Sequence, residues 1–140
     1  MSYREKVAWL SLLAMAVTFG PYFTITALNP PDATLPNFAQ MKLLAITTIT
    51  QVIILAIGHL VLRSRSPEEA RAPLDERDLV IKQRSVSAAY YFLIGGMILV
   101  GCIMPFTDTG WRIVNSALFM IVLSLVLHDG LIVLAYRRQS

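Results

Sequence analysis

The chain is poor in the residues and patterns that catalysis commonly needs. It has a single cysteine, Cys102, so an intrachain disulfide and dithiol redox chemistry are excluded. It also lacks a nucleotide-binding motif between a strand and a helix, a metal-ligand spacing and a recognisable nucleophile set. We therefore expect no enzymatic activity, no bound metal and no cofactor, although a membrane enzyme with an unfamiliar site stays open as a minor alternative.

Long apolar stretches are what the sequence does have. Each is close to the roughly 20 residues with which a helix crosses ~30 Å of hydrocarbon. They run over Val7 to Leu28, Leu43 to Leu62, Val86 to Phe106 and Ile113 to Tyr136. A hydrophobic content of 56% and a mean hydropathy of +0.62 suit lipid rather than water as the solvent. The sequence thus predicts an all-α fold, a polytopic bundle of four transmembrane helices.

No separate soluble domain fits between these spans. The longest connection, residues 63–85, is too short for one, so residues 1–140 should form a single transmembrane domain. Three prolines within residues 29–37 exclude a helix there, because proline lacks a backbone N–H and restricts the residue before it. Arg4 and Lys6 ahead of an apolar stretch also suit a signal peptide. That stretch is longer than the usual apolar region of one, so we expect it to stay as a helix.

The basic residues are distributed unevenly over the loops. The formal net charge is +3 at pH 7, and in a four-span arrangement only Lys42 and Arg112 lie on one side. The other side carries Arg4, Lys6, Arg63, Arg65, Arg71, Arg77, Lys82, Arg84, Arg137 and Arg138. The positive-inside rule then puts both termini and the loop 63–85 in the cytoplasm, with the protein in the cell membrane. Such residues set topology and contact lipid headgroups, and we expect no nucleic acid as a partner.

The second half of the loop predicts a helix that continues into the third span. Leu74 to Ser85 should be helical without a break before the third span, with Asp75 as the N-cap and Asp78 at the N3 position as a weaker form of the capping box. Asp78 and Lys82 then stand one turn apart in the favourable order, acid before base. A helix start that is structured, charged and exposed to water is suited to binding a protein partner.

One segment of the sequence resembles a known group of proteins. It comprises Asp75-Glu76-Arg77-Asp78, then Ile81, Lys82 and the pair Tyr90-Tyr91 inside the third span. Residues 74–95 thereby resemble a family of small, uncharacterised four-helix membrane proteins of prokaryotes that carry an Asp-Glu-Arg motif before the third helix. The resemblance implies an integral protein of the prokaryotic cytoplasmic membrane, and no activity is established for the family. Its members are often encoded beside small helix-turn-helix regulators, which would imply a part in signalling.

Asp129 is the leading candidate for a functional residue inside the membrane. It precedes Arg137 by about eight residues, or about 12 Å along a helix, and an ionised carboxylate at that depth costs several kcal/mol unless it is paired. Estimated depth allows an intramembrane polar cluster of His59, Tyr90, Tyr91, His128 and Asp129. A carboxylate beside an imidazole can hold and release a proton, as a proton-coupled carrier requires. A carboxyl that only clips two helices together is the alternative.

Other polar residues and glycines in the spans favour packing roles. His59 and His128 differ in estimated depth by about five residues, or ~7 Å, which disfavours a shared haem iron. His128 and Asp129 are about 100° apart on one helix, so the two side chains cannot both point at the bundle axis.

Gln51 lies near the midplane, where its amide should bond across helices. The third span has Gly95, Gly96 and Gly101, which would let a neighbouring helix approach closely.

Two functional hypotheses follow from the sequence. The first is a regulatory or accessory membrane subunit that engages a protein partner through Asp75, Glu76, Arg77, Asp78 and Lys82. Exposed charges at a helix start are often only a solvated surface, which is the competing interpretation. The second hypothesis is a small oligomeric proton-linked transporter or channel that uses Asp129 and His59. The expected partners are the lipid bilayer, a cytoplasmic protein and further copies of the chain.

Overall fold

The computed structural model of the protein describes residues 1–31, 37–108 and 110–139, and this part of the chain is helical without any strand. The long helices are α1 (Tyr3–Leu28), α2 (Phe38–Arg65), α4 (Glu76–Ile98) and α5 (Trp111–Arg138). Between α2 and α4 lies the short α3 (Pro67–Arg71), and α4 continues into the π-helical η1 (Leu99–Ile103) and the 3₁₀ turn η2 (Met104–Phe106). The predicted all-α fold is confirmed.

Four of these segments are long and apolar enough to cross a membrane. They coincide with α1, α2, α5 and the continuous run Glu76–Phe106. Each extends beyond the apolar stretch seen in the sequence, because polar residues continue the helix at its ends; α2, for example, starts at Phe38 and ends at Arg65. The proline-rich connection falls between α1 and α2 as expected, although residues 32–36 lie outside the described residues.

Side-chain caps determine where three of the helices begin. Ser2, Asn37 and Asp75 each accept a hydrogen bond from the backbone N–H three residues further on, at 3.2, 3.0 and 2.7 Å. Such a bond satisfies one of the N–H groups that the first turn leaves unpaired. The predicted start of α4 at Asp75 is therefore confirmed. The start of α5 has no side-chain cap and instead follows Gly110, whose φ of 63° is a left-handed conformation that suits glycine.

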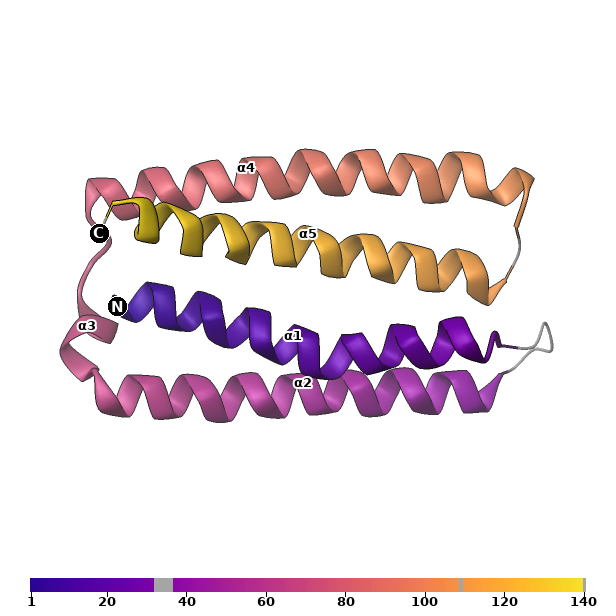
Figure 1. The fold of residues 1–140 in the computed structure, drawn as a ribbon, viewed down its shortest axis with the longest axis horizontal. Coiled ribbons are helices and arrows are strands. Elements are labelled where there is room, and N and C mark those ends of the chain that lie inside the picture. The colour runs from indigo at the N-terminus through magenta and orange to yellow at the C-terminus, as the bar shows by residue number, and fades with distance from the viewer. Residues whose placement is uncertain (32–36, 109, 140) are drawn as a thin grey trace.

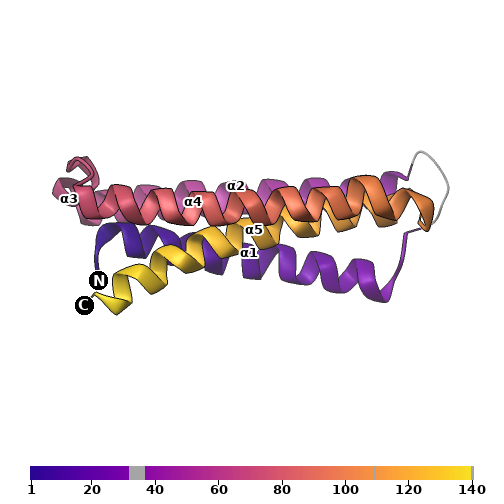
Figure 2. The same cartoon turned by 90° about the horizontal axis from the view of Figure 1, so that it is seen from above.

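The four long helices form a row that Figure 1 and Figure 2 together show to be curved, rather than a closed square. The order across the row is α4, α5, α1, α2, and helix contacts join α4 to α5, α5 to α1 and α1 to α2. In the view from above, α1 and α5 cross each other on one side, and α2 and α4 overlap on the other (Figure 2). Both termini, α3 and the start of α4 lie together at one end of the bundle, which we call the terminal end.

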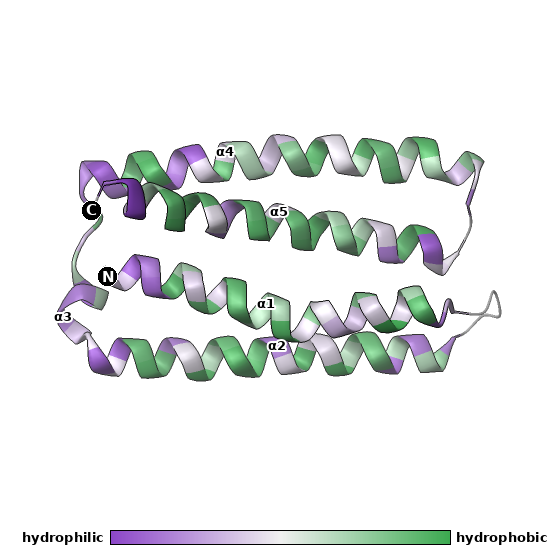
Figure 3. Ribbon diagram, in the orientation of Figure 1, coloured by the Kyte–Doolittle hydropathy of each residue, from purple (hydrophilic) through white to green (hydrophobic). Residues whose placement is uncertain are grey.

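Many large apolar side chains of the row are exposed on its outside. Helix α2 buries only Gln40 and Thr47, whereas large apolar side chains along it are more than half exposed, among them Ile46, Ile49, Val52, Ile57 and Leu60. Apolar residues occupy the middle of the long helices and hydrophilic ones gather towards the two ends (Figure 3). A water-soluble protein rarely exposes so much contiguous apolar surface, and hydrocarbon requires it. The fold is that of a multi-pass membrane protein.

Helices α4 and α5 approach each other closely at Gly96. A Cβ atom added there would lie 2.8 Å from Sδ of Met120, while one added at Gly95 or Gly101 would meet nothing within 4 Å. A few turns away, Ser124 Oγ on α5 donates a hydrogen bond of 3.1 Å to the Ala89 carbonyl oxygen on α4. Of the three glycines, Gly96 is thus the one whose missing side chain admits the neighbouring helix.

Candidate functional site at the terminal end

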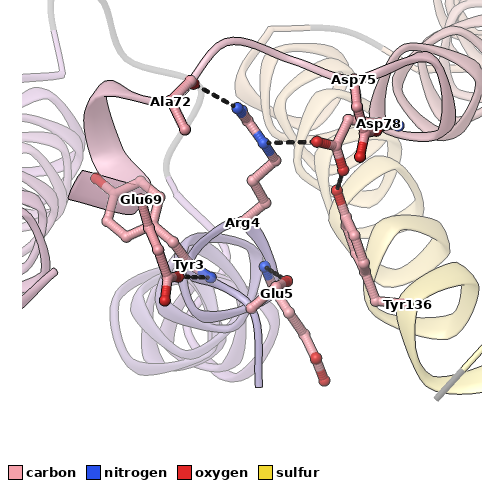
Figure 4. Close-up of polar contacts among 9 residues, drawn as sticks. Tyr3, Arg4, Glu5, Glu69, Ala72, Asp75, Asp78 and Tyr136 are labelled. Atoms are coloured by element: carbon pink, nitrogen blue, oxygen red, sulfur yellow. Dashed lines mark hydrogen bonds and ion pairs between the residues drawn. The ribbon is translucent and has the colours of Figure 1, made fainter. Parts of the chain in front are cut away.

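An ion pair at the terminal end joins the beginnings of α1 and α4. Arg4 Nε lies 3.3 Å from Asp78 Oδ2, and the Tyr136 hydroxyl at the end of α5 donates a hydrogen bond to the other oxygen of the same carboxylate. Figure 4 shows the Asp78 carboxylate between the two side chains. One carboxylate therefore connects three helices that are far apart in the sequence.

The loop before α4 is also held against the start of α1. The backbone N–H of Tyr3 donates to Glu69 Oε2 at 3.0 Å, and Arg4 Nη2 donates to the Ala72 carbonyl oxygen at 3.2 Å. In Figure 4 the guanidinium of Arg4 reaches the loop with one nitrogen and Asp78 with another. The first turn of α1 thus organises both α3 and the start of α4.

A second pair lies on the other side of α1. Arg137 Nε donates to Glu5 Oε1 at 3.4 Å, and the same guanidinium lies 5.4 Å from the ring centre of Trp9. The Arg77 guanidinium lies 5.5 Å from the ring centre of Tyr136 in a similar arrangement. Cation–π contacts at exposed sites are worth about 0.5 to 1 kcal/mol each. They help to keep the end of α5 between α1 and α4.

Asp129 and His128 meet on α5 and face a common pocket. His128 Nδ1 lies 3.2 Å from Asp129 Oδ1, and their side chains are 27% and 13% exposed. The pocket holds about 240 Å³ and is bounded by α1, α4, α5 and the loop residue Leu74. Both side chains line this pocket although they leave α5 about 100° apart.

The structure does not bring the other members of the expected polar cluster to Asp129. His59 is exposed on α2, where its Nδ1 contacts the Leu55 carbonyl oxygen at 2.7 Å, and α1 lies between α2 and α5. Tyr90 and Tyr91 are 56% and 72% exposed on α4. Neighbours of theirs on the same helix, Ser85 and Ala89, are buried, so the tyrosines lie on another face of α4. A similar estimated depth in the membrane therefore did not mean that these side chains face the same side of the bundle.

The charged segment at the start of α4 is used largely for internal contacts. Asp75 caps the helix, Asp78 binds Arg4 and Tyr136, and Arg77 lies against the Tyr136 ring. Glu76 and Lys82 are exposed, and Lys82 stands at the edge of the pocket that Asp129 faces. Of the residues expected to bind a partner, these two are the least engaged within the chain.

Two polar contacts inside the row tie helices together away from the terminal end. Thr18 Oγ1 on α1 donates to Gln51 Oε1 on α2 at 2.7 Å, which confirms the expected cross-helix bond of Gln51. Near the opposite end, Tyr22 donates to Asn115 Oδ1 at 2.6 Å and accepts from Gln40 Nε2 at 2.8 Å. Sequence reasoning missed this second group, although two amides close to the span ends were a usable signal.

No metal site is evident in the part of the chain that the structure describes, since it contains no group of three or more His, Cys, Asp or Glu side chains that could hold a metal ion. Comparison with known protein families, with curated proteins and with solved structures finds no match to this chain.

Proposed function

We propose that this chain is an accessory or regulatory subunit of a prokaryotic cell membrane, oriented with both termini and α3 in the cytoplasm. The orientation rests on the concentration of basic residues at the terminal end. In this proposal the chain binds a protein partner at the terminal end and has no catalytic activity of its own.

The observation that supports partner binding best is a groove between α4 and α5 at the terminal end. It measures about 540 Å³, and three arginines, Arg77, Arg84 and Arg138, line it. Its apolar lining includes Val80, Leu131 and Leu134. Glu76 is the acidic residue of this lining, so the groove combines apolar side chains with more basic than acidic ones. Such a groove suits an amphipathic helix with acidic residues beside its apolar face.

The ordered loop supports the same proposal. The contacts of Tyr3 and Arg4 with Glu69 and Ala72 hold the segment between α2 and α4 in one place, so the start of α4 is a fixed surface. A fixed surface loses less conformational entropy on binding than a mobile loop would. Among the exposed charges that line the groove, Arg77 lies against Tyr136, whereas Glu76, Arg84 and Arg138 have no described contact with Tyr136 or Asp78.

The test is copurification after extraction in a mild detergent. The variant Arg84→Glu should lose a partner that the unaltered chain retains, because it reverses a charge at the groove while leaving α4 intact. The matched control is Arg63→Glu, an exposed arginine at the end of α2 and away from the groove. If both variants retain the same proteins as the unaltered chain, or if Arg63→Glu loses them equally, the groove is not the partner site.

A proton-linked carrier is the second candidate, in a form that relies on Asp129 and His128. The observation that favours it is the contact of 3.2 Å between these two side chains at a partly open pocket. His59, which the sequence suggested as the partner of Asp129, lies on α2 beyond α1. We rank this candidate below the accessory subunit because no second polar group from another helix bonds to Asp129 in the described chain.

A further inference from the structure

Two carboxylates line the 240 Å³ pocket, and among the described residues one of them, Asp129, has no ion pair with a lysine or an arginine. Asp78 faces the pocket too, but the Arg4 guanidinium at 3.3 Å and the Tyr136 hydroxyl occupy both of its oxygens. Within the described residues, Asp129 contacts His128, its neighbour on the same helix, and makes no bond to α1 or α4. An ionised carboxylate among helices in a membrane is costly unless a cation accompanies it.

The rest of the pocket lining is mainly apolar. Val7 and Ala8 on α1, Ile81 on α4 and Ile132 on α5 form its walls around Asp129. A small hydrated ion gains nothing from such walls, whereas an alkyl chain does, by about 0.8 kcal/mol for each buried CH₂ group. The pocket therefore matches a ligand that joins a positive group to an apolar chain.

Lys82 is a second cation at this pocket besides Arg4, which pairs with Asp78. Lys82 is exposed, and the described chain shows no ion pair between it and Asp129. A lysine at the edge of a membrane helix can extend its ammonium towards the headgroups while its stem stays in the apolar layer. Such an arrangement leaves the carboxylate accessible to a ligand.

We propose that this pocket binds the ammonium group of a lipophilic amine, with Asp129 as its counter-ion and the apolar walls of α1, α4 and α5 around its chain. The site is separate from the groove proposed for the protein partner, which lies between α4 and α5 and contains Arg84 and Arg138 instead. Two sources share the required chemistry: an aminophospholipid of the bilayer and a soluble alkylamine. In both cases the Asp129 carboxylate binds the ammonium group by charge-assisted hydrogen bonding.

The test uses octylamine and octanol, which share a chain and differ in the ammonium group. Binding to the unaltered protein in detergent is measured by native mass spectrometry, and octylamine should bind at least about tenfold more tightly, as expected for a charge-assisted hydrogen bond. The variant Asp129→Asn should lower octylamine affinity to that of octanol, whereas Glu68→Gln, which removes an exposed carboxylate on α3, should leave it unchanged. Lys82→Met should leave octylamine binding unchanged or tighten it, because it removes a repelling cation.

Two outcomes would overturn the proposal: equal binding of octylamine and octanol by the unaltered protein, or full octylamine affinity in a folded Asp129→Asn variant. The first comparison needs no variant, so it decides the matter even if Asp129→Asn fails to fold. A second experiment identifies whether the amine comes from the bilayer or from solution. In it, the protein is extracted from vesicles of phosphatidylethanolamine or of phosphatidylglycerol, and the lipid that stays bound is identified. If the protein selectively retains phosphatidylethanolamine, the ligand of the site is a lipid. If it retains neither lipid selectively but binds octylamine, the ligand is a soluble amine.

Discussion

Arg4 Nε and Asp78 Oδ2 lie 3.3 Å apart, and this pair connects the first turn of the first span to the first turn of the third. Because Arg4 also donates to the Ala72 carbonyl oxygen and Asp78 accepts from Tyr136, the pair is the centre of a network that includes α1, α4, α5 and the loop between α2 and α4. The network fixes the terminal end, where both the proposed partner groove and the amine pocket lie.

The coupling between Arg4 and Asp78 should be measurable. In a double-mutant cycle with Arg4→Met and Asp78→Asn, we expect a coupling of about 1 kcal/mol in the free energy of unfolding, since the pair is only partly exposed and belongs to a network. The measurement is a denaturant titration in mixed micelles. The control cycle uses Arg112 and Asp108 at the opposite end, where the Arg112 side chain is 77% exposed and the coupling should be about 0.3 kcal/mol. Equal coupling energies in the two cycles would mean that the network does not strengthen the interaction between Arg4 and Asp78.

The bond between Thr18 and Gln51 should stabilise the contact of α1 with α2. Replacing Gln51 with Leu removes the acceptor of the 2.7 Å bond, and we expect a loss of about 1 kcal/mol of unfolding free energy, in line with cross-helix bonds in membranes. Thr48→Val is the control, because the Thr48 hydroxyl is exposed and bonds only to the Leu44 carbonyl oxygen of its own helix. A Gln51→Leu protein as stable as the control would show that the bond is energetically neutral.

Two adjacent glycines should respond differently to the same substitution. Gly96→Ala brings a Cβ atom to 2.8 Å from Met120 Sδ, so Met120 must move, and we expect a loss of about 1 kcal/mol. Gly95→Ala meets nothing within 4 Å and should be neutral or slightly stabilising, because alanine is the better helix former. Thermal unfolding in detergent distinguishes the two variants, and the reverse order of stability would contradict the described packing of α4 on α5.

Substitutions of Asp129 distinguish a role of its carboxyl in proton-linked transport from a purely structural role. Asp129→Asn keeps the volume of the side chain but removes its titrating proton, so a carrier would fold normally and lose proton-linked transport. Asp129→Leu should cost little stability, because the carboxylate bonds to no other helix among the described residues. Ser124→Ala is the reference for a real cross-helix bond and should cost about 1 kcal/mol. Proton-linked transport that survives Asp129→Asn would remove the coupling role.

The proposed orientation can be checked by labelling single cysteines in intact cells. In a Cys102→Ser background, we expect Thr107→Cys to react with an impermeant maleimide from outside and Ala70→Cys to react only after the cells are opened. Thr107 is exposed next to η2 at the end opposite the termini, and Ala70 lies in α3 at the terminal end. Labelling of Ala70→Cys from outside would place the termini outside the cell.

The sequence by itself determined the four spans, the start of α4 at Asp75 and the need of Gln51 for a partner on another helix. These are local properties: the length of an apolar stretch, the capping of one helix and the cost of an unpaired amide in lipid. Each could be read from residues near one another in the chain, and the structure agrees with each.

Only the tertiary structure decided which polar residues meet. The row order α4, α5, α1, α2 puts His59 beyond α1, turns Tyr90 and Tyr91 to an outer face, and brings Asp78 to Arg4 and Tyr136. In a soluble protein an apolar stripe marks the inward face of a helix, but a helix in lipid is apolar on nearly all sides. Helical periodicity therefore could not show which face of each span turns inward, and that choice depended on how the helices pack together.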